Sequence, residues 1–356
     1  MDKRLNILYI SKLRKSNACG VTTAVLQLFE YIYDFANVIW LDLGNDKFEV
    51  NKRITRVDID NYLNQNIDIA VFEDPFNSVK FCKIARELKK RDIPYILFPH
   101  GCFHSIALKR KALKKSIAIK TVFKRYLNES VATQFLSTNE KDNSIVFNTP
   151  IVVPNGIHTN SNFSEKKTLR KLVFIGRKDV HNKGLDILLK AVLELKEPLI
   201  QKGIELSIYG PKESEKDEEY IDSFIKKMHL EKIVKNNGAV FGEEKEKVLI
   251  ESDVFIQTSR HEGFPMSILE ALTYGLPVIV TEGTNFSNIV NDHNAGVGVP
   301  TSKESVVNAI KIIMNCNDFV LKSKNAYSLG NGYSWDSICK KTVETYSELV
   351  RKYHGN

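Results

Sequence analysis

The sequence predicts two doubly wound α/β domains in tandem, each built on a parallel β-sheet. Short apolar runs rich in β-branched residues alternate with longer segments of helical period, which is the pattern of βαβ units. The length of 356 residues also exceeds the roughly 250 to 300 at which a single hydrophobic core stops growing. Finally, turn residues and a polar run within 154–168 separate two sets of such apolar runs, which places the domain linker there.

The first set of runs gives the N-terminal domain. Its predicted strands are 5–10, 38–43, 69–72, 95–98 and 151–153. Helices are predicted at 22–33 and 79–90, because apolar residues recur there every three to four positions. Parallel sheets bind ligands beyond the carboxyl ends of their strands, so the residues that follow each strand are the candidates for function.

The second set of runs gives the C-terminal domain. Its predicted strands are 172–175, 206–209, 254–257, 278–281 and 296–299. Its predicted helices are 185–195, 267–274 and 306–314. A last helix at 335–353 follows the final strand and has no strand after it, so it can pack on either domain.

Composition and charge exclude several classes of protein. The chain has 51 Lys and Arg against 43 Asp and Glu, a formal net charge of +8. It has no run of about 18 uncharged apolar residues, the length that a bilayer core requires, and its first residues do not read as an export signal. A cytoplasmic location is therefore expected. The five cysteines are scattered without metal-ligand spacing, so neither disulfides nor a zinc site is expected.

The positive charge is concentrated in residues 109–125. Eight Lys or Arg and no acid lie there: Lys109, Arg110, Lys111, Lys114, Lys115, Lys120, Lys124 and Arg125. They alternate with apolar residues at helical spacing, which is typical of a helix on an anionic membrane surface. Nucleic-acid binding would instead spread basic residues over a groove or interleave them with aromatics. We therefore expect peripheral membrane contact and no nucleic-acid partner; a solvated basic helix is the alternative.

The most informative segment, 262–270, follows the predicted strand 254–257. Pro265 is typical of the first turn of a helix, and Gly263 lets a ligand approach the backbone closely. Backbone amides at the start of a helix bind anions, so this segment predicts a phosphate site. The amides expected to face the phosphate are those of Phe264, Met266 and Ser267.

Two carboxylates flank this predicted phosphate site. Glu262 stands in the loop before the helix, and Glu270 lies about a turn and a half inside it. Carboxylates beside a bound phosphate are expected to accept hydrogen bonds from hydroxyls, so a sugar and a ribose would fill the two positions. A capped helix with two surface glutamates is the alternative.

A second candidate cluster lies at 176–184. Arg177 comes just after the strand 172–175, and Lys183 comes just before a helix, so both cations can reach one point at the edge of the sheet. Two such charges stabilise a diphosphate, particularly as it gains charge on leaving. The segment is not a Walker loop, because GxxxxGK followed by Ser or Thr is absent.

These residues resemble those of glycosyltransferase family 4. The resemblance rests on Arg177 with Lys183, on 262–270 with its Gly-Phe-Pro, and on Pro-Asn-Gly-Ile at 154–157. It covers nearly the whole chain and implies the GT-B fold. The implied organisation is an acceptor-binding domain at 1–158, a nucleotide-sugar-binding domain at 159–334, and a C-terminal helix at 335–356 that returns to the first domain.

The resemblance implies retaining transfer of a sugar from a nucleotide diphosphate sugar, with no metal and no other cofactor. In such enzymes the Arg and Lys, here Arg177 and Lys183, bind the diphosphate in the role that a metal plays elsewhere. Glu262 would contact hydroxyls of the donor sugar, and Glu270 the ribose. The full set of implied donor-binding positions is Glu270, Gly263, Phe264, Pro265, Met266, Ser267, Gly20 and Gly210.

Three further positions bear on the resemblance. His100 follows the strand 95–98 and matches the family's N-terminal-domain histidine, which contacts the donor sugar; a structural histidine at a strand end is the alternative. Gly20 matches only one of the two glycines that the family usually has after the first strand. The backbone around Gly210 and the 238–242 loop would select the base, with UDP preferred over GDP or dTDP.

Acidic residues after the strand 69–72 are candidates for acceptor binding. Glu73 and Asp74 lie there as a pair, with a structural cap as the alternative. Asp58 and Asp60 superficially fit an Asp-x-Asp metal site, but they lie outside the donor domain, so metal-dependent chemistry is a weak alternative.

The expected function is transfer of a hexose or N-acetylhexosamine to a glycan acceptor, in particular a lipid-linked oligosaccharide of bacterial surface polysaccharide synthesis. An epimerase of the same fold is an alternative, and would convert the donor without an acceptor. A glycan phosphorylase would need a pyridoxal lysine, for which no segment argues. A non-enzymatic binder of nucleotide sugars or nucleic acid is a third alternative, but it gives Glu262 and His100 no functional role.

Overall fold

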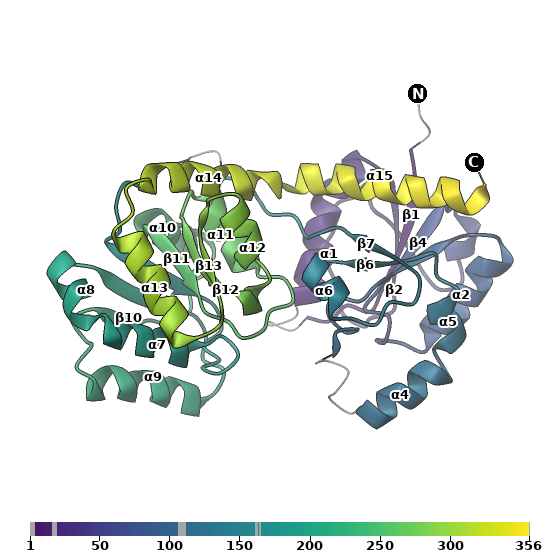
Figure 1. Ribbon diagram of the computed structural model, residues 1–356. Helices are drawn as coiled ribbons and strands as arrows, with labels where there is room; N and C mark the ends of the chain where they lie inside the picture. Colours follow the sequence, from purple (N-terminus) through teal and green to yellow (C-terminus); the bar gives the residue numbers. More distant parts are fainter. Residues whose placement is uncertain (1–3, 16–19, 106–111, 161–162, 164, 356) are drawn as a thin grey trace. The chain divides into compact units, whose positions relative to one another are not determined.

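The computed structural model describes residues 4–355 except 16–19, 106–111, 161–162 and 164 (Figure 1). Two compact units make up the chain. The first comprises Met1–Gly156 together with Trp335–Asn356, and the second comprises Ile157–Ser334. The division after Gly156 lies within the Pro-Asn-Gly-Ile turn, two residues before the boundary expected from the sequence.

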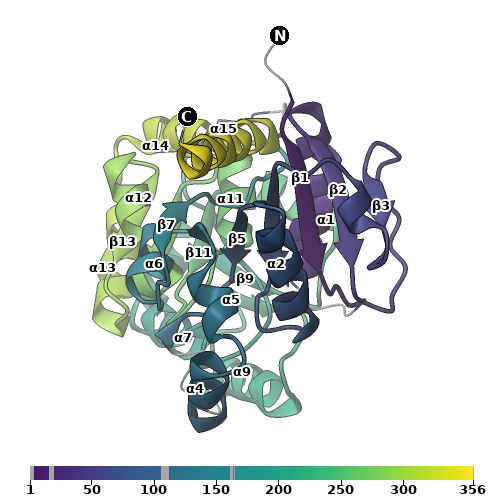
Figure 2. The same ribbon diagram turned by 90° about the vertical axis from the view of Figure 1, so that its right-hand side faces the viewer.

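The first unit is built on a seven-stranded parallel sheet of order β3-β2-β1-β4-β5-β6-β7. The strands are β1 (Asn6–Ser11), β2 (Asn37–Asp42), β3 (Thr55–Val57), β4 (Ile69–Glu73), β5 (Tyr95–Phe98), β6 (Ala132–Phe135) and β7 (Thr149–Val152). Its helices include α1 (Gly20–Tyr31), α2 (Lys80–Lys90), α4 (Ala112–Lys120), α5 (Lys124–Asn128), α6 (Thr138–Asp142) and α15 (Trp335–His354). Figure 2 shows β1, β2 and β3 side by side at one edge.

The second unit is built on a six-stranded parallel sheet of order β10-β9-β8-β11-β12-β13. The strands are β8 (Lys171–Ile175), β9 (Glu205–Tyr209), β10 (Val234–Asn236), β11 (Val254–Gln257), β12 (Val278–Thr281) and β13 (Gly296–Val299). Its helices are α7 (Leu185–Glu194), α8 (Lys196–Lys202), α9 (Glu215–Lys227), α10 (Gly242–Glu251), α11 (Met266–Thr273), α12 (Ser287–Asp292), α13 (Lys303–Met314) and α14 (Phe319–Gly332).

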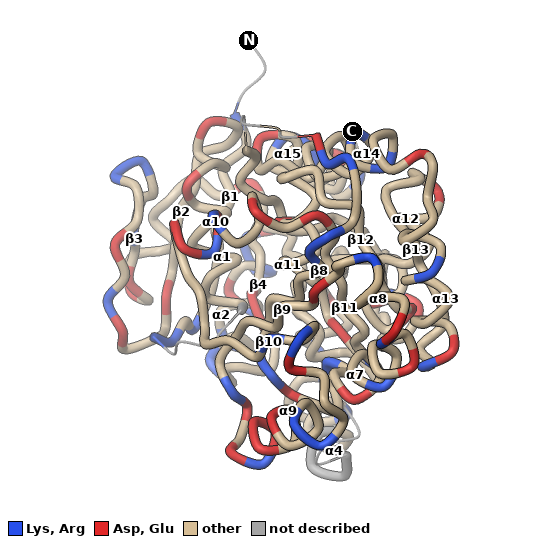
Figure 3. The backbone as a smooth tube through the Cα atoms, turned by 90° about the vertical axis from the view of Figure 1, so that its left-hand side faces the viewer, with Lys and Arg blue, Asp and Glu red and all other residues tan. Residues whose placement is uncertain are grey.

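Helices cover both faces of the second sheet. Alternate residues of a strand point to opposite faces, so neighbouring residues pack against different helices. Phe174 of β8 belongs to a core shared with α7, α9 and α13. Its neighbours Val173 and Ile175 belong to a different core, shared with α10, α11, α12 and α14. Charged residues of both signs lie along the outer helix α9 (Figure 3).

Helix α15 belongs to the first unit, although it follows the second unit in the sequence. It buries Trp335, Ile338 and Tyr346 and packs beside α1. The Tyr346 hydroxyl donates to Oε1 of Gln134 on β6 at 2.5 Å. Both Trp335 and Gly156 lie where the chain passes between the units, and a Cβ on Gly156 would come within 2.4 Å of the indole ring.

The structure corrects several predicted elements. Strands β3, β6 and β10 were not predicted, and β7 begins two residues earlier than expected. The basic segment was expected as one helix, but α4 ends at Lys120 and α5 begins at Lys124. Residues 109–111 of that segment lie outside the described part of the chain.

Candidate active site

The loops that follow β8 and β11 meet at the carboxyl edge of the second sheet. These strands are neighbours, and β8 pairs with β9 on its other side, so the direction of winding reverses at this point. Such a reversal is the usual ligand position in a doubly wound sheet. Arg260 joins the loops, donating two hydrogen bonds of 2.7 and 2.8 Å to the Asp186 carboxylate and one of 2.6 Å to the His181 carbonyl.

Gly184 allows this close approach of the two loops. Its φ is +65°, in the left-handed region that favours glycine. A Cβ at this position would lie 1.9 Å from the Thr258 carbonyl oxygen, which no side chain could tolerate. Thr258 in turn donates its hydroxyl to the Gly184 carbonyl at 2.9 Å.

Lys183 and Glu262 form an ion pair across these loops, with Nζ and Oε1 2.6 Å apart. The same Oε1 accepts hydrogen bonds from Gln257 at 2.7 Å and Ser259 at 2.6 Å. The two side chains are only 19% and 11% exposed, so water screens their charges weakly. The structure therefore pairs two residues that the sequence predicted as parts of two separate clusters.

Arg177, in the loop after β8, pairs with a residue that follows β9. Its guanidinium pairs with Glu213 at 2.8 Å, and its side chain is 52% exposed. Burial alone would raise the pKa of Asp179, but hydrogen bonds from Asn182 and the charges of Arg177 and Lys183 hold that pKa below its usual value. Both cations thus lie near Asp179, and in this structure each pairs with a different carboxylate.

The start of α11 is partly as predicted. The helix begins at Met266, with Pro265 as its N-terminal cap. The Met266 amide donates to the Phe264 carbonyl at 3.1 Å, so the expectation that it is available to an anion is wrong for this conformation. Gly263 borders open space, and the Ser267 hydroxyl donates to Gln257 at 2.9 Å. Gln257 therefore links the start of α11 to Glu262.

Glu270 and Gly210 also have structural partners. The Glu270 carboxylate pairs with Lys245 of α10, and both side chains are partly exposed. Gly210 has a φ of +148°, and a Cβ there would lie 1.8 Å from the Gly176 carbonyl oxygen. Gly210 is thus required for the close approach of the chain segments that follow β9 and β8.

His100 and Glu73 contact each other in the first unit. The imidazole Nε2 pairs with Oε2 of Glu73, and both side chains are almost fully buried. His100 has a φ of +46°, and its ring stacks on Phe98 at 3.8 Å between centroids. The next amide, that of Gly101, donates to Oε1 of Glu140 at 2.7 Å. The sequence predicted His100 and Glu73 as separate contacts of donor and acceptor, not as a pair.

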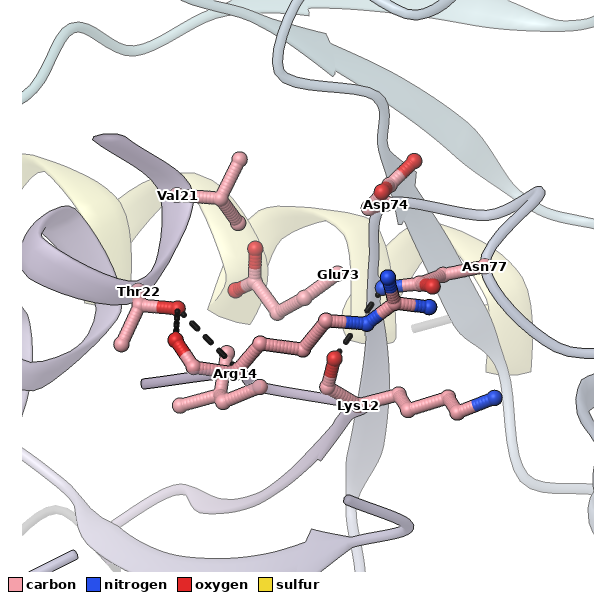
Figure 4. A pocket seen from close by; sticks show the side chains of 8 residues that line it. Lys12, Arg14, Val21, Thr22, Glu73, Asp74 and Asn77 are labelled. Carbon is pink, nitrogen blue, oxygen red and sulfur yellow. Dashed lines mark hydrogen bonds between the residues drawn. The ribbon is translucent and has the colours of Figure 1, made fainter. Parts of the chain in front are cut away.

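The remaining predicted residues of the first unit lie around the ends of β1 and β4. Asp74 follows β4 with a φ of +50°, and its amide donates to the Phe98 carbonyl at 2.9 Å. Gly20 is the first residue of α1, and residues 16–19 before it lie outside the described chain. Glu73 and Asp74 line a pocket at this edge, with Lys12 and Arg14 opposite them (Figure 4).

Asp58 is explained by local backbone structure. Its Oδ1 accepts from the amides of Asp60 at 3.0 Å and Asn61 at 2.9 Å, which is a turn-stabilising arrangement. Among the described residues, no group of three or more His, Cys, Asp or Glu lies close enough to hold a metal ion. In the described chain, no helix is both long and apolar enough to span a bilayer.

Two residues near the site were missed by sequence reasoning. Lys178 is 2% exposed, and its Nζ binds Glu218 at 2.6 Å and Asn236 at 3.0 Å, tying the loop after β8 to α9 and β10. It lies beside Arg177 in the sequence, and nothing in the pattern separates a buried lysine from an exposed one there. Gln257 could have been found, because a polar residue ends the otherwise apolar strand β11.

Comparison with solved structures identifies the class of fold. UDP-bound HepE from Anabaena superposes with a TM-score of 0.70 at 15% identity, covering 97% of this chain and 100% of that one. WaaG, a glycosyltransferase involved in lipopolysaccharide biosynthesis, superposes with a TM-score of 0.61 at 13% identity, covering 95% and 99%. Two parallel Rossmann-like units of this kind constitute the GT-B fold.

Sequence comparison then gives a match in the second unit. Residues 158–328, which lie within this unit, match the family described as Glycosyl transferases group 1. An uncharacterized glycosyltransferase of Methanocaldococcus jannaschii is 26% identical over 257 residues, which covers 65% of this chain and 63% of that protein. The chain thus spans less than two thirds of the length of this relative.

Proposed function

We propose that this protein is a glycosyltransferase that takes its sugar from a nucleotide diphosphate sugar. The observation that carries the proposal is the cluster of Lys183, Glu262 and the start of α11 at the reversal point of the second sheet. The Glycosyl transferases group 1 match to residues 158–328 contains this cluster, and the finer assignment to glycosyltransferase family 4 is part of the proposal.

The cations of the cluster are suited to a diphosphate. In the free protein Lys183 and Arg177 are each paired with a carboxylate. A diphosphate would compete for both cations, and its charge would be matched by them and by the positive end of α11. We propose that Glu262 then accepts from hydroxyls of the donor sugar and Glu270 from the ribose, with UDP the preferred nucleotide.

The proposed reaction is retaining and needs no metal. The bond between the sugar C1 and the diphosphate oxygen breaks, and a bond from C1 to the acceptor oxygen forms on the same face. The proton of the acceptor hydroxyl passes to the departing diphosphate, whose developing charge Arg177 and Lys183 stabilise. His100 is proposed as a further contact of the transferred hexose or N-acetylhexosamine.

The proposed acceptor is a lipid-linked oligosaccharide of bacterial surface polysaccharide synthesis, met at the cytoplasmic face of the membrane. Support comes from the segment that contains α4 and α5. Lys120, Lys124 and Arg125 are exposed there, and Ile117 and Val122 are 55% and 54% exposed beside them. Exposed apolar groups next to cations suit the interface of an anionic bilayer.

The test is sugar transfer in vitro with EDTA present. The protein is incubated with UDP-glucose, UDP-N-acetylglucosamine, GDP-mannose or dTDP-rhamnose and a polyprenyl diphosphate-linked sugar. We expect one donor to give an extended glycolipid by mass spectrometry, with the donor's anomeric configuration retained by NMR. Glu262→Gln should lose most of this activity, and the surface control Glu194→Gln should keep it. Donor conversion that needs no acceptor would instead indicate an epimerase.

A further inference from the structure

The first sheet has a reversal point of its own, and a pocket lies at it. Strand β1 pairs with β2 on one side and β4 on the other, so ligands are expected beyond the carboxyl ends of β1 and β4. A pocket of about 190 Å³ lies there (Figure 4). Its lining residues are Lys12, Leu13, Arg14, Val21, Thr22, Glu73, Asp74 and Asn77.

Glu73 offers this pocket an unused acceptor. The residue is 1% exposed, and its Oε2 is paired with His100. Among the described residues, its other oxygen, Oε1, is buried and has no hydrogen-bond partner. A buried carboxylate oxygen without a donor costs free energy, so a ligand that supplies a hydroxyl there would be favoured. Figure 4 shows the Glu73 side chain extending toward Val21 and Thr22 of α1.

Lys12 and Arg14 provide two cations in the same pocket, and hydrogen bonds to their carbonyl groups fix their backbones. The Lys12 carbonyl accepts from Asn77 at 3.1 Å, and the Arg14 carbonyl accepts from the Thr22 hydroxyl at 3.1 Å. Within the described chain, neither the Lys12 nor the Arg14 side chain forms an ion pair. In Figure 4 the Arg14 guanidinium lies next to Asn77, across the pocket from the Glu73 carboxylate.

The Glu73 side of the pocket and the side with Arg14 and Lys12 are suited to different groups of one ligand. A purely anionic ligand would leave Glu73 Oε1 without a donor, and a neutral sugar would leave Arg14 without a counter-ion. We infer that the pocket binds a sugar that carries a phosphate or diphosphate, with a sugar hydroxyl on Glu73 and the phosphate on Arg14 and Lys12. This inference rests on the proposed function, because such a sugar would be the acceptor.

The test is calorimetric binding to the full-length protein without any nucleotide. The probes are glucose 6-phosphate, a synthetic farnesyl diphosphate-linked N-acetylglucosamine, N-acetylglucosamine and inorganic phosphate. The first two distinguish a free sugar phosphate from a lipid-linked one. The variants are Arg14→Gln and the isosteric Glu73→Gln, with Lys52→Gln as an exposed control on the same unit, and circular dichroism verifies that each is folded.

We expect at least one phosphorylated sugar to bind more tightly than N-acetylglucosamine and inorganic phosphate. Arg14→Gln should weaken that binding about tenfold or more, and Lys52→Gln should leave it unchanged. Equal binding to Arg14→Gln and the wild type, equal affinity for inorganic phosphate, or no binding of either phosphorylated sugar would overturn the inference. Because no nucleotide is present, these results are separate from donor binding by the second unit, on which the proposed function depends.

Discussion

Glu262 is the acceptor on which the arrangement of the candidate site depends. Replacing it with Gln keeps its shape but leaves the Lys183 charge without its partner in a place mostly shielded from water. We expect Glu262→Gln to lower the free energy of unfolding by about 1–2 kcal/mol, measured by urea denaturation. Glu194→Gln, which breaks an exposed pair with Lys303, should have a much smaller effect. Equal losses would mean that the Lys183 pair is no more than a surface contact.

Gly184 and Gly263 lie in the two loops of the site, and a side chain would be tolerated at only one of them. Gly184→Ala should lower the midpoint of thermal unfolding, because its Cβ would collide with the Thr258 carbonyl and its φ is positive. Gly263→Ala meets nothing within 4 Å and should leave that midpoint nearly unchanged. If a phosphate approaches Gly263 as proposed, this second variant should still weaken nucleotide binding. A stable Gly184→Ala would contradict the described loop geometry.

The residue types of the candidate site could be predicted from the sequence, but their partners could not. Glu262 was predicted because it follows a strand, and Lys183 because it comes just before a helix in the loop after another strand of the same sheet. The pairing of His100 with Glu73 depends on a left-handed backbone at His100 and on stacking against Phe98, and neither leaves a sequence signal. Lys178 was missed for a similar reason, since its burial follows from the packing of α9.

Helix α15 is attached to the first unit by a buried hydrogen bond as well as by apolar contacts. Tyr346→Phe removes the donor to Gln134 Oε1 and leaves that oxygen buried. We expect the free energy of unfolding to fall by about 1–2 kcal/mol. Tyr353→Phe is the comparison: its hydroxyl donates to Asp92 at 2.9 Å in a solvent-exposed hydrogen bond, so its loss should be clearly smaller. An unchanged stability of Tyr346→Phe would show that α15 is held by its apolar face alone.

Helices α4 and α5 carry the proposed membrane contact. Substituting Lys120, Lys124 and Arg125 with Gln should reduce co-sedimentation with vesicles that contain anionic phospholipid, because each basic residue near such a surface contributes about 1 kcal/mol. The same number of changes on α9, at Lys216, Lys226 and Lys227, is the control. Equal vesicle binding by both triple variants would contradict the proposed membrane contact of α4 and α5.

The central strands were predictable because they are apolar and buried, whereas short or polar strands were not. Strands β3 and β10 have three residues each and lie at sheet edges. Strand β6 is fully buried but includes Thr133 and Gln134, whose side chains are hydrogen-bonded. A single sequence does not reveal such partners, so strand β6 was not predicted because of these polar residues. The same limit applies to the break between α4 and α5, where Phe123 turns into the core.

The proposed function requires a nucleotide site on the second unit that works without a metal. The most direct measurement is thermal unfolding with UDP, GDP or dTDP in the presence of EDTA. A ligand that binds only the folded protein stabilises it by about 2.7 kcal/mol at a hundredfold excess over Kd. Arg177→Ala removes one proposed contact of the diphosphate, and Lys303→Ala is an exposed control.

We expect one nucleotide, with UDP preferred, to raise the unfolding midpoint of the wild type and of Lys303→Ala and to raise that of Arg177→Ala much less. Stabilisation by no nucleotide, or equal stabilisation of Arg177→Ala and the wild type, would contradict the proposed diphosphate site.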